Sequence, residues 1–533
     1  MARVRSRWRF SGGIRRRLAD GLTVVVSARG RRTLGGTAAG TVLVGVGAAA
    51  VVSGLVGAGM GDGFAGSGLM VATGAALALV GAVAVTLTRP PPTVGALELY
   101  GALVAALATG VVAVALVFMA TSAPAHPVDA LVEATAGVGT VSASLVADPA
   151  RLDAGQLAFR ALVQWLAGAG VIVIIVRVLP FLGAGGLEEA GGDAVSAAQR
   201  LWPTRWGSIR RLLRLYGGLT VVTTFAYRLA GMGGFDAVLH GLTTVSSGGW
   251  STRADSIGAW GSPAVEWVAL VAMFTVGVSL PLTFRALRNR RPGALLRSVE
   301  FRVYVIVVAV AWVALLVWSG ETGHESIRRA GFAVVSTMST TGFSAGGLAR
   351  FGSQGVVLLT ALAVVGGMAA SITAGLKVSR GLAMVGLMGR EVQAHLHPRA
   401  VRAVTVGSSP LDEPTIEQMT AEVTFAMLVA AAGYVGLALA GSGVLDAFTT
   451  TISSLSTVGV DWVATDPTSM LRLLSRPGRV VAAVLMFGGR GSLTPLMVVV
   501  ASGLAGVSRT MRDLTGSVGT GGRRLRDHRG DRR

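Results

Sequence analysis

The sequence contains no cysteine, which excludes disulfide bonds, thiolate metal sites and cysteine nucleophiles. Charged residues are scarce and make up 14% of the 533 residues, whereas a soluble domain carries about a quarter. Lysine occurs once, at Lys377. No glycine-rich nucleotide fingerprint follows a strand pattern, and no catalytic triad or zinc-ligand spacing is present. These absences argue against a soluble enzyme.

Long apolar runs are abundant instead. Hydrophobic residues make up 52% of the chain, and its mean hydropathy is +0.64. Runs of about 20 residues are long enough to cross the hydrocarbon core of a bilayer. We therefore predict an all-α polytopic membrane protein with about ten transmembrane helices. The apolar runs lie near residues 38–59, 65–87, 94–119, 157–182, 211–231, 264–284, 301–319, 355–376, 418–440 and 479–503.

The formal net charge of +20 is concentrated in arginine clusters, with ten arginines in residues 1–32 and another group at the end of the chain. Basic segments beside membrane spans indicate cytoplasmic anchors rather than a nucleic-acid site. The long basic start also argues against a cleavable signal peptide. Every second connection is basic, so we predict a multi-pass protein of the cytoplasmic membrane with both termini inside. The internal connections contribute Arg89, Arg200, Arg205, Arg210, Arg211, Arg285, Arg288, Arg290, Arg291, Arg380, Arg390, Arg399 and Arg402.

The opposite connections, after the third, fifth, seventh and ninth runs, are semi-apolar and rich in Ser, Thr and Gly. They align on a triplet that ends each hydroxyl-rich stretch. The four triplets are Thr140, Val141 and Ser142; Ser247, Gly248 and Gly249; Thr340, Thr341 and Gly342; and Thr457, Val458 and Gly459. Six residues before the end of each triplet stand Ala136, Thr243, Ser336 and Ser453.

Membrane physics suggests what four such interruptions do. Non-helical backbone at membrane depth is tolerated only when it is buried in protein or lines a water-filled cavity. A chain that enters as a short helix and returns extended can direct carbonyl oxygens toward an axis and replace the hydration shell of a cation. Oxygen ligands without a carboxylate favour a monovalent cation. The triplets therefore predict a filter for K+ or Na+; the alternative is four ordinary outward loops.

Several motifs resemble the superfamily of Trk, Ktr and HKT potassium transporters. They are "EATAG" at 133–137, "QWLAGAGVIVI" at 164–174, "SSGGWST" at 246–252, "STTGF" at 339–343 and "FGGRGSLTPL" at 487–496. The resemblance covers roughly residues 94–505 and implies four pseudo-symmetric helix–pore loop–helix repeats, preceded by the helix pair of Trk-type members. The expected parts are a basic N-terminus (1–37), the helix pair (38–90), pore repeats 1 to 4 (91–190, 200–291, 298–385 and 415–505) and a basic tail (506–533).

The resemblance also implies an intramembrane gate below the filter, in "VVGGMAASITAGLK" at 364–377. Its glycines and hydroxyl residues weaken a helix, although small residues also serve close helix packing. An arginine near the ion path would raise the barrier to cations; the alternative is a structural salt bridge. The lysine either belongs to the gate or reaches toward the cytoplasmic face. The predicted gate residues are Gly366, Gly367, Ser371, Thr373, Gly375, Lys377 and Arg490.

Further expectations follow from the resemblance alone. It implies a lipid-embedded homodimer that works with a separate cytoplasmic nucleotide-binding gating subunit. The transported ion would be K+ or Na+, with no covalent cofactor and no nucleic-acid partner.

Three features depart from the family pattern or stay open. Ser142 stands where the family most often has glycine, which resembles plant HKT members associated with sodium permeation; a register on Gly139 would lose the match at Glu133. Asp461 either attracts cations at the pore mouth or is an ordinary solvated residue. His240, one turn after Asp236, is a hydrogen-bonded structural residue, or else part of a metal site or proton relay.

Two other classes of protein compete with a cation channel. A secondary transporter with broken helices requires a central acidic residue, and the sequence gives no mid-span carboxylate in the pore halves. A membrane-embedded enzyme or scaffold requires a catalytic cluster near a membrane face, to which six scattered histidines contribute little. We therefore predict monovalent cation uptake rather than enzymatic activity.

Overall fold

The computed structural model describes residues 33–502, except 90, 92–93, 123, 125, 178–204, 347, 398–402, 407–408, 464–465, 467–469 and 491–492. The basic clusters predicted at the two termini lie outside the described residues. Arg200, Arg399 and Arg402 of the internal basic connections lie outside them as well.

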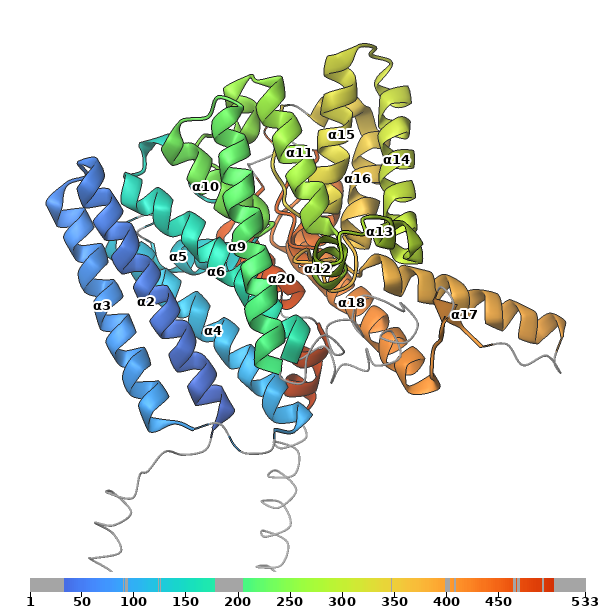
Figure 1. The fold of residues 1–533 in the computed structure, drawn as a ribbon, viewed down its shortest axis with the longest axis horizontal. Helices are drawn as coiled ribbons and strands as arrows, with labels where there is room; N and C mark the ends of the chain where they lie inside the picture. Colours follow the sequence, from blue (N-terminus) through green and yellow to red (C-terminus); the bar gives the residue numbers. More distant parts are fainter. Residues whose placement is uncertain are drawn as a thin grey trace, which may run out of the picture.

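The described chain begins with a pair of long helices, α2 (Leu34–Met60) and α3 (Phe64–Leu87). They lie together along one edge of the molecule (Figure 1). Small residues allow this contact, because a Cβ on Gly47 would collide with the backbone of Gly74 and Ala78. The predicted N-terminal helix pair therefore has its counterpart in α2 and α3.

Each later section contains a long helix, a short helix and a second long or broken helix. Repeat 1 has α4 (Ala96–Ala120), α5 (Pro127–Gly139), η1 (Pro149–Arg151) and α6 (Ala154–Arg177). Repeat 2 has α9 (Arg205–Leu229), α10 (Gly234–Val245), η3 (Ser256–Trp260), α11 (Pro263–Gly277) and α12 (Leu280–Arg288), followed by α13 (Gly293–Arg297). Repeat 3 has α14 (Val299–Ser319), α15 (His324–Met338), η4 (Leu348–Phe351), α16 (Gly352–Val365) and α17 (Val378–Leu396). Repeat 4 has α18 (Glu413–Leu439), α19 (Val444–Leu455) and α20 (Arg476–Arg490).

Between α17 and α18 lie two very short strands, β1 (Thr405–Val406) and β2 (Ser409–Pro410), which pair antiparallel. The register pairs Thr405 with Pro410 and Val406 with Ser409. They are the only strands among the described residues. The fold is therefore all-α and polytopic, as predicted.

Six of the described helices are long and apolar enough to span a membrane, and two bent helix pairs bring the number to eight. The other two predicted runs coincide with α9, which begins among arginines, and with α16, which has only 14 residues. The sixth predicted run is not one continuous helix, because α11 and α12 meet at an angle of 102°. The break falls at Val278 and Ser279, and Pro281 is the second residue of the helix that follows.

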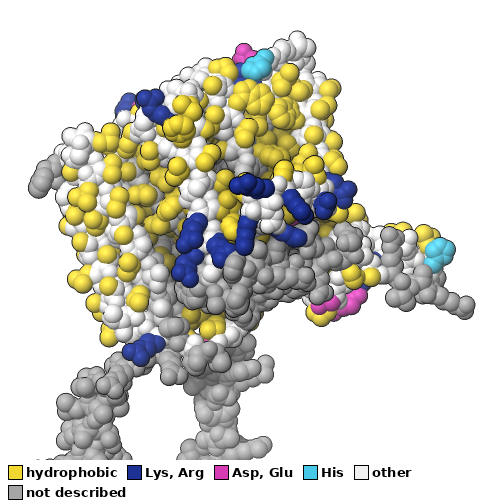
Figure 2. Space-filling model, in the orientation of Figure 1, with side chains coloured by type: hydrophobic (Ala, Val, Ile, Leu, Met, Phe, Trp, Pro, Cys, Tyr) yellow, Lys and Arg dark blue, Asp and Glu magenta, His cyan; other side chains and the backbone are white. Residues whose placement is uncertain are grey.

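The surface of the bundle matches a lipid environment. Figure 2 shows a largely hydrophobic face crossed by a band of basic side chains over α9, α12 and α13. On α9, the side chains of Val221, Val222 and Phe225 are 69%, 67% and 63% exposed. Exposure of this kind is costly in water and normal in lipid. The exposed arginines of this band are Arg210 and Arg214 near the start of α9, Arg288 on α12, Arg290 and Arg291 in the turn that follows, and Arg297 on α13. Arg228 is exposed as well but stands in the last turn of α9, outside the band.

Candidate functional site

The short helices α5, α10, α15 and α19 lead directly into the four triplets. Each carries an acidic residue in its first turn, which stabilises the positive end of the helix dipole. The C-terminal, negative ends of the dipoles therefore face the triplets, where they favour a cation. The first-turn acidic residues are Asp129, Asp236, Glu325 and Asp446.

The four triplets share one backbone geometry. The first residue of each has a positive φ: 49° at Thr140, 52° at Ser247, 52° at Thr340 and 55° at Thr457. The amide of each middle residue donates to the carbonyl of the residue five positions earlier. These bonds join Val141 to Ala136 at 2.8 Å, Gly248 to Thr243 at 2.8 Å, Thr341 to Ser336 at 3.0 Å and Val458 to Ser453 at 2.9 Å.

Two features of the structure require glycine at the third position of three triplets: the backbone conformation and the lack of space for a side chain. Gly249, Gly342 and Gly459 have φ values of 72°, 72° and 82°, which disfavour a side chain. Space is also lacking: a Cβ at Gly249 would collide with the carbonyl oxygen of Thr341, and one at Gly342 with that of Val458. The predicted triplets thus lie against one another although they are far apart in sequence.

Ser142 breaks the fourfold pattern. It is absent from the positive-φ residues of the described chain, and its amide donates to the Val458 carbonyl across the site at 3.2 Å. Its hydroxyl donates to the same oxygen at 2.7 Å. Two donors on one carbonyl leave that oxygen less available to a cation.

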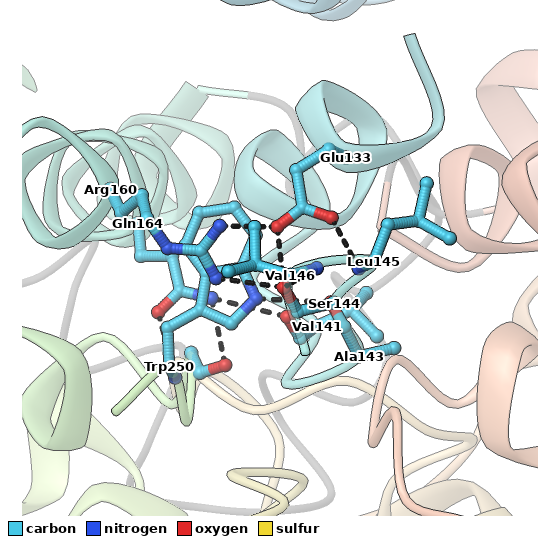
Figure 3. Close-up of polar contacts among 10 residues, drawn as sticks. Glu133, Val141, Ala143, Ser144, Leu145, Val146, Arg160, Gln164 and Trp250 are labelled. Atoms are coloured by element: carbon cyan, nitrogen blue, oxygen red, sulfur yellow. Dashed lines mark hydrogen bonds and ion pairs between the residues drawn. The ribbon is translucent and has the colours of Figure 1, made fainter. Parts of the chain in front are cut away.

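A polar brace lies behind the first two triplets (Figure 3). The side-chain amide of Gln164 on α6 donates to the Val141 carbonyl at 3.1 Å and to the Gly248 carbonyl at 2.8 Å. Its oxygen accepts from the backbone amide of Trp250 at 3.2 Å. One α6 side chain therefore joins repeats 1 and 2 and draws two triplet carbonyls toward itself.

The same brace includes a buried ion pair between Arg160 and Glu133. Glu133 also accepts from the Ser144 hydroxyl at 2.7 Å and from the Leu145 amide at 2.7 Å. The Arg160 guanidinium lies 4.0 Å from the centre of the Trp250 ring, a cation–π contact. Figure 3 shows the pair beside the chain that follows the first triplet.

Repeats 3 and 4 use a simpler brace. The Ser336 hydroxyl donates to the Phe343 carbonyl at 2.7 Å, and the Ser453 hydroxyl donates to the Val460 carbonyl at 2.8 Å. Repeat 1 has Ala136 at the equivalent position, which cannot make this bond. The Glu133 and Arg160 cluster supplies the support on that side.

The predicted gate residues lie on a non-helical segment between α16 and α17, with Arg490 at the end of α20. Gly366 and Gly375 have φ values of 68° and 83° and approach closely, because a Cβ on either would meet the backbone of the other. Ser371, Thr373, Gly375, Lys377 and Arg490 line one cavity of about 270 Å³. The Ala374 amide donates to the Thr340 hydroxyl at 3.0 Å, so the segment contacts the third triplet.

Two of the alternatives for this segment are wrong. The Arg490 guanidinium donates to the Ile372 carbonyl at 3.2 Å, and no carboxylate of the described chain pairs with it, so it forms no structural salt bridge there. The Lys377 ammonium binds the Thr373 carbonyl and lies 3.4 Å from the Ser371 hydroxyl. It turns back onto its own segment instead of reaching a membrane surface.

His240 is a structural residue in this fold. Its ring nitrogens contact the Asp236 carbonyl at 2.8 Å and the Ser251 hydroxyl at 3.0 Å. In the part of the chain that the structure describes, no cluster of three or more His, Asp or Glu side chains could hold a metal. Asp461 is 8% exposed and accepts from the Val463 amide at 3.0 Å, so the prediction of an ordinary solvated residue is wrong.

Two buried carboxylates lie near the segment between α16 and α17. Glu300 and Glu422 are 6% and 7% exposed and line the cavity beneath the triplets. Glu300 directly precedes the predicted apolar run 301–319, and Glu422 lies near the start of the run 418–440, so neither stands in the middle of a run. Ionisable residues beside spans are themselves a signal of function, and that signal could have drawn attention to Arg160 and Glu300.

The sequence of this chain is similar to those of known cation transport proteins. The family model TrkH, described as a cation transport protein, matches residues 101–504. The Escherichia coli K12 "Trk system potassium uptake protein TrkH" is 30% identical over 338 residues, covering 62% of this chain and 70% of its own length. The Halomonas elongata protein of the same description is 31% identical over 370 residues, covering 67% and 76%.

A solved structure agrees in shape. The crystal structure of the potassium transporter TrkH from Vibrio parahaemolyticus is similar with a TM-score of 0.76 and 26% identity, covering 86% of this chain and 96% of that one. The helical fold defines a multi-pass membrane protein. The chain belongs to the TrkH family of cation transport proteins, and it is a transporter rather than an enzyme.

Proposed function

We propose that this protein takes up K+ across the cytoplasmic membrane through a channel-like pore. The observation that carries the proposal is the shared geometry of four triplets that meet at the C-terminal ends of four short helices. The relatives described as Trk potassium uptake proteins support the choice of ion. A negative interior would drive uptake with about 2.3 kcal/mol per charge per 100 mV.

The twelve triplet residues form the filter in this proposal, and the segment between α16 and α17 forms the gate. Contact between Ala374 and Thr340 supports the gate, because it brings the segment against the inner end of the filter. The Arg490 guanidinium adds a fixed positive charge in the same cavity. A positive charge there would raise the energy of a passing cation until the segment moves.

Sodium remains a second candidate ion because of Ser142. In the proposal its hydroxyl competes with the ion for the Val458 carbonyl. A filter with fewer free carbonyls discriminates less strongly between cations.

Orientation and partners complete the proposal. The band of arginines over α9, α12 and α13 faces the cytoplasm, following the positive-inside bias. A homodimer and a cytoplasmic nucleotide-binding gating subunit are proposed from the family resemblance. The projecting helix α17 (Figure 1) supports a protein contact, since Val385, Met388 and Val392 on it are 68%, 68% and 60% exposed.

Coupled secondary transport of a small solute or ion is the alternative function. The buried carboxylates Glu300 and Glu422 favour it, because coupling to protons or Na+ needs an acidic group near the path. A channel gives flux that follows the gradient of one ion. A coupled carrier gives saturable flux with a fixed stoichiometry.

The deciding experiment measures K+ and Na+ flux separately in liposomes that hold the purified protein. Gly342→Asp should abolish flux, because the new side chain would collide with the Val458 carbonyl and the Ser142 hydroxyl. Gly261→Asp is the matched control, since Gly261 also has a positive φ of 54° but has open space around it. Undiminished flux in a folded Gly342→Asp protein would remove the filter assignment.

A further inference from the structure

A carboxylate lies buried beneath the triplets and outside every motif used so far. Glu300 stands in the first turn of α14 and is 6% exposed. Its side chain lines the cavity that also receives Ser371, Lys377 and Arg490. A carboxylate removed from water must be compensated by hydrogen-bond donors. The identity of those donors indicates what Glu300 does.

The donors are backbone amides from the two ends of the intramembrane segment. Glu300 Oε1 accepts from the Ala369 amide at 2.6 Å, near the start of the segment, and from the Ser379 amide at 3.2 Å, just beyond its end. Ser379 is the second residue of α17, so its amide is one of the unpaired donors at that helix start. A single oxygen therefore joins the entry and the exit of the segment.

The middle of the segment is held against the filter by separate bonds. The Ala374 amide donates to the Thr340 hydroxyl at 3.0 Å, and Thr340 is fully buried. Hydroxyls at the equivalent positions of the other triplets, on Thr140, Ser247 and Thr457, are buried without a partner in the described residues. Among the four first-position hydroxyls, the segment therefore bonds to that of Thr340, whereas the other three make no hydrogen bond within the described residues.

We infer that Glu300 is a positioning residue that clasps the gate segment in its closed place against the filter. The inference rests on the proposed function of that segment as a gate. Release of the Ala369 and Ser379 amides from Glu300 lets the segment withdraw. Withdrawal breaks the bond between Ala374 and Thr340, which frees the Thr340 hydroxyl to act with the other three hydroxyls as an oxygen ligand for the cation.

The first test measures basal K+ flux in liposomes without any cytoplasmic subunit. Glu300→Ala leaves two buried amides unpaired, and flux should rise at least about tenfold, as the loss of charge-assisted hydrogen bonds implies. Glu300→Gln keeps an oxygen acceptor without the charge, so its flux should be intermediate. This graded order distinguishes a clasp from general loss of stability, which a thermal midpoint monitors in parallel.

Glu422→Gln is the comparison variant for charge. Glu422 lines the same cavity, and its carboxylate pairs with Arg380 on α17 at 2.9 Å. If negative charge in the cavity controls flux, Glu422→Gln raises it as much as Glu300→Ala does. That result would overturn the clasp.

A second readout does not depend on conduction. The chain has no cysteine, so Ala374→Cys provides a single thiol on the segment. A water-soluble thiol reagent is applied from the side on which the basic connections lie. It should label the Ala374→Cys, Glu300→Ala double variant about tenfold faster than the Ala374→Cys single variant. Equal labelling rates overturn the clasp whether or not the protein conducts. Faster labelling in Glu300→Ala, with no cation flux in that same variant, would retain the clasp and reject cation conduction.

Discussion

At the scale of single residues, Ser142 is the feature that separates the proposed pore from a fourfold one. We expect Ser142→Gly to raise the K+ over Na+ permeability ratio by about fivefold, the equivalent of one hydrogen bond. The physical reason is that the substitution removes the hydroxyl that donates to the Val458 carbonyl. Reversal potentials or paired liposome fluxes measure the ratio. Ser142→Ala removes the hydroxyl but keeps a Cβ, and equal ratios in all three proteins would contradict the idea.

The buried pair behind the first triplet makes a different prediction, about stability. Glu133→Gln should destabilise the protein by about 3 kcal/mol, because Arg160 is left as a buried charge without its partner. A thermal-shift measurement in detergent gives the direction as a lowered midpoint. Arg151→Gln breaks the exposed pair with Asp148 and should change the midpoint little. A similar midpoint for Glu133→Gln and the parent would show that the brace is dispensable.

Sequence indicated the register of the triplets but not their supports. The hydroxyl-and-glycine pattern repeats in four places, so positions such as Thr340 and Gly342 could be aligned by eye. Gln164 bonds to Gly248, 84 residues away, and Ser142 bonds to Val458, 316 residues away. No local pattern encodes such contacts, because they depend on how four repeats pack around one axis.

At the scale of elements, the segment between α16 and α17 is held partly by its own lysine. Lys377→Gln should raise basal K+ flux several-fold, since the ammonium bonds to the Thr373 carbonyl and places positive charge in the cavity. Flux into liposomes without the cytoplasmic subunit measures the effect. Arg390→Gln on α17 is the control, because Arg390 pairs with Glu413 away from the cavity, at 2.5 Å. Lower or unchanged flux with Lys377→Gln would remove the lysine from the gate.

The positions of the helices could be predicted well from the apolar runs, but the breaks within them could be predicted less well. Ten runs correspond to ten helical regions, and Gly366 correctly suggested where α16 ends. The 102° break between α11 and α12 was missed. Val278 and Ser279 are themselves compatible with a helix, and besides Pro281 the break is accompanied by backbone hydrogen bonds from the gate segment. The Met368 amide donates to Gly277, and the Leu280 amide donates to Ala370, at 2.9 and 3.1 Å.

At the scale of the whole molecule, charge and lipid exposure together fix the expected orientation. The exposed arginines at the start of α9, on α12 and α13 and in the turn between those two helices lie at one level of the bundle (Figure 2), whereas the short helices approach from the opposite connections. In the proposed function, the positive-inside bias would place the arginine level in the cytoplasm. The proposed filter would then lie nearer the outside and the proposed gate segment nearer the inside. Cations would therefore meet the filter before the gate during uptake.

Two exposed positions, one before and one after α14 in the sequence, test this orientation. Asn289 precedes α13 and α14 among the arginines, and Thr322 lies between α14 and α15. In the cysteine-free chain, Thr322→Cys should react with a membrane-impermeant thiol reagent applied to intact cells. Asn289→Cys should react only after the membrane is permeabilised. Each variant is a control for the other, because both side chains are exposed. The opposite labelling pattern would mean that the protein has the inverse orientation, with the gate segment on the outer side of the filter.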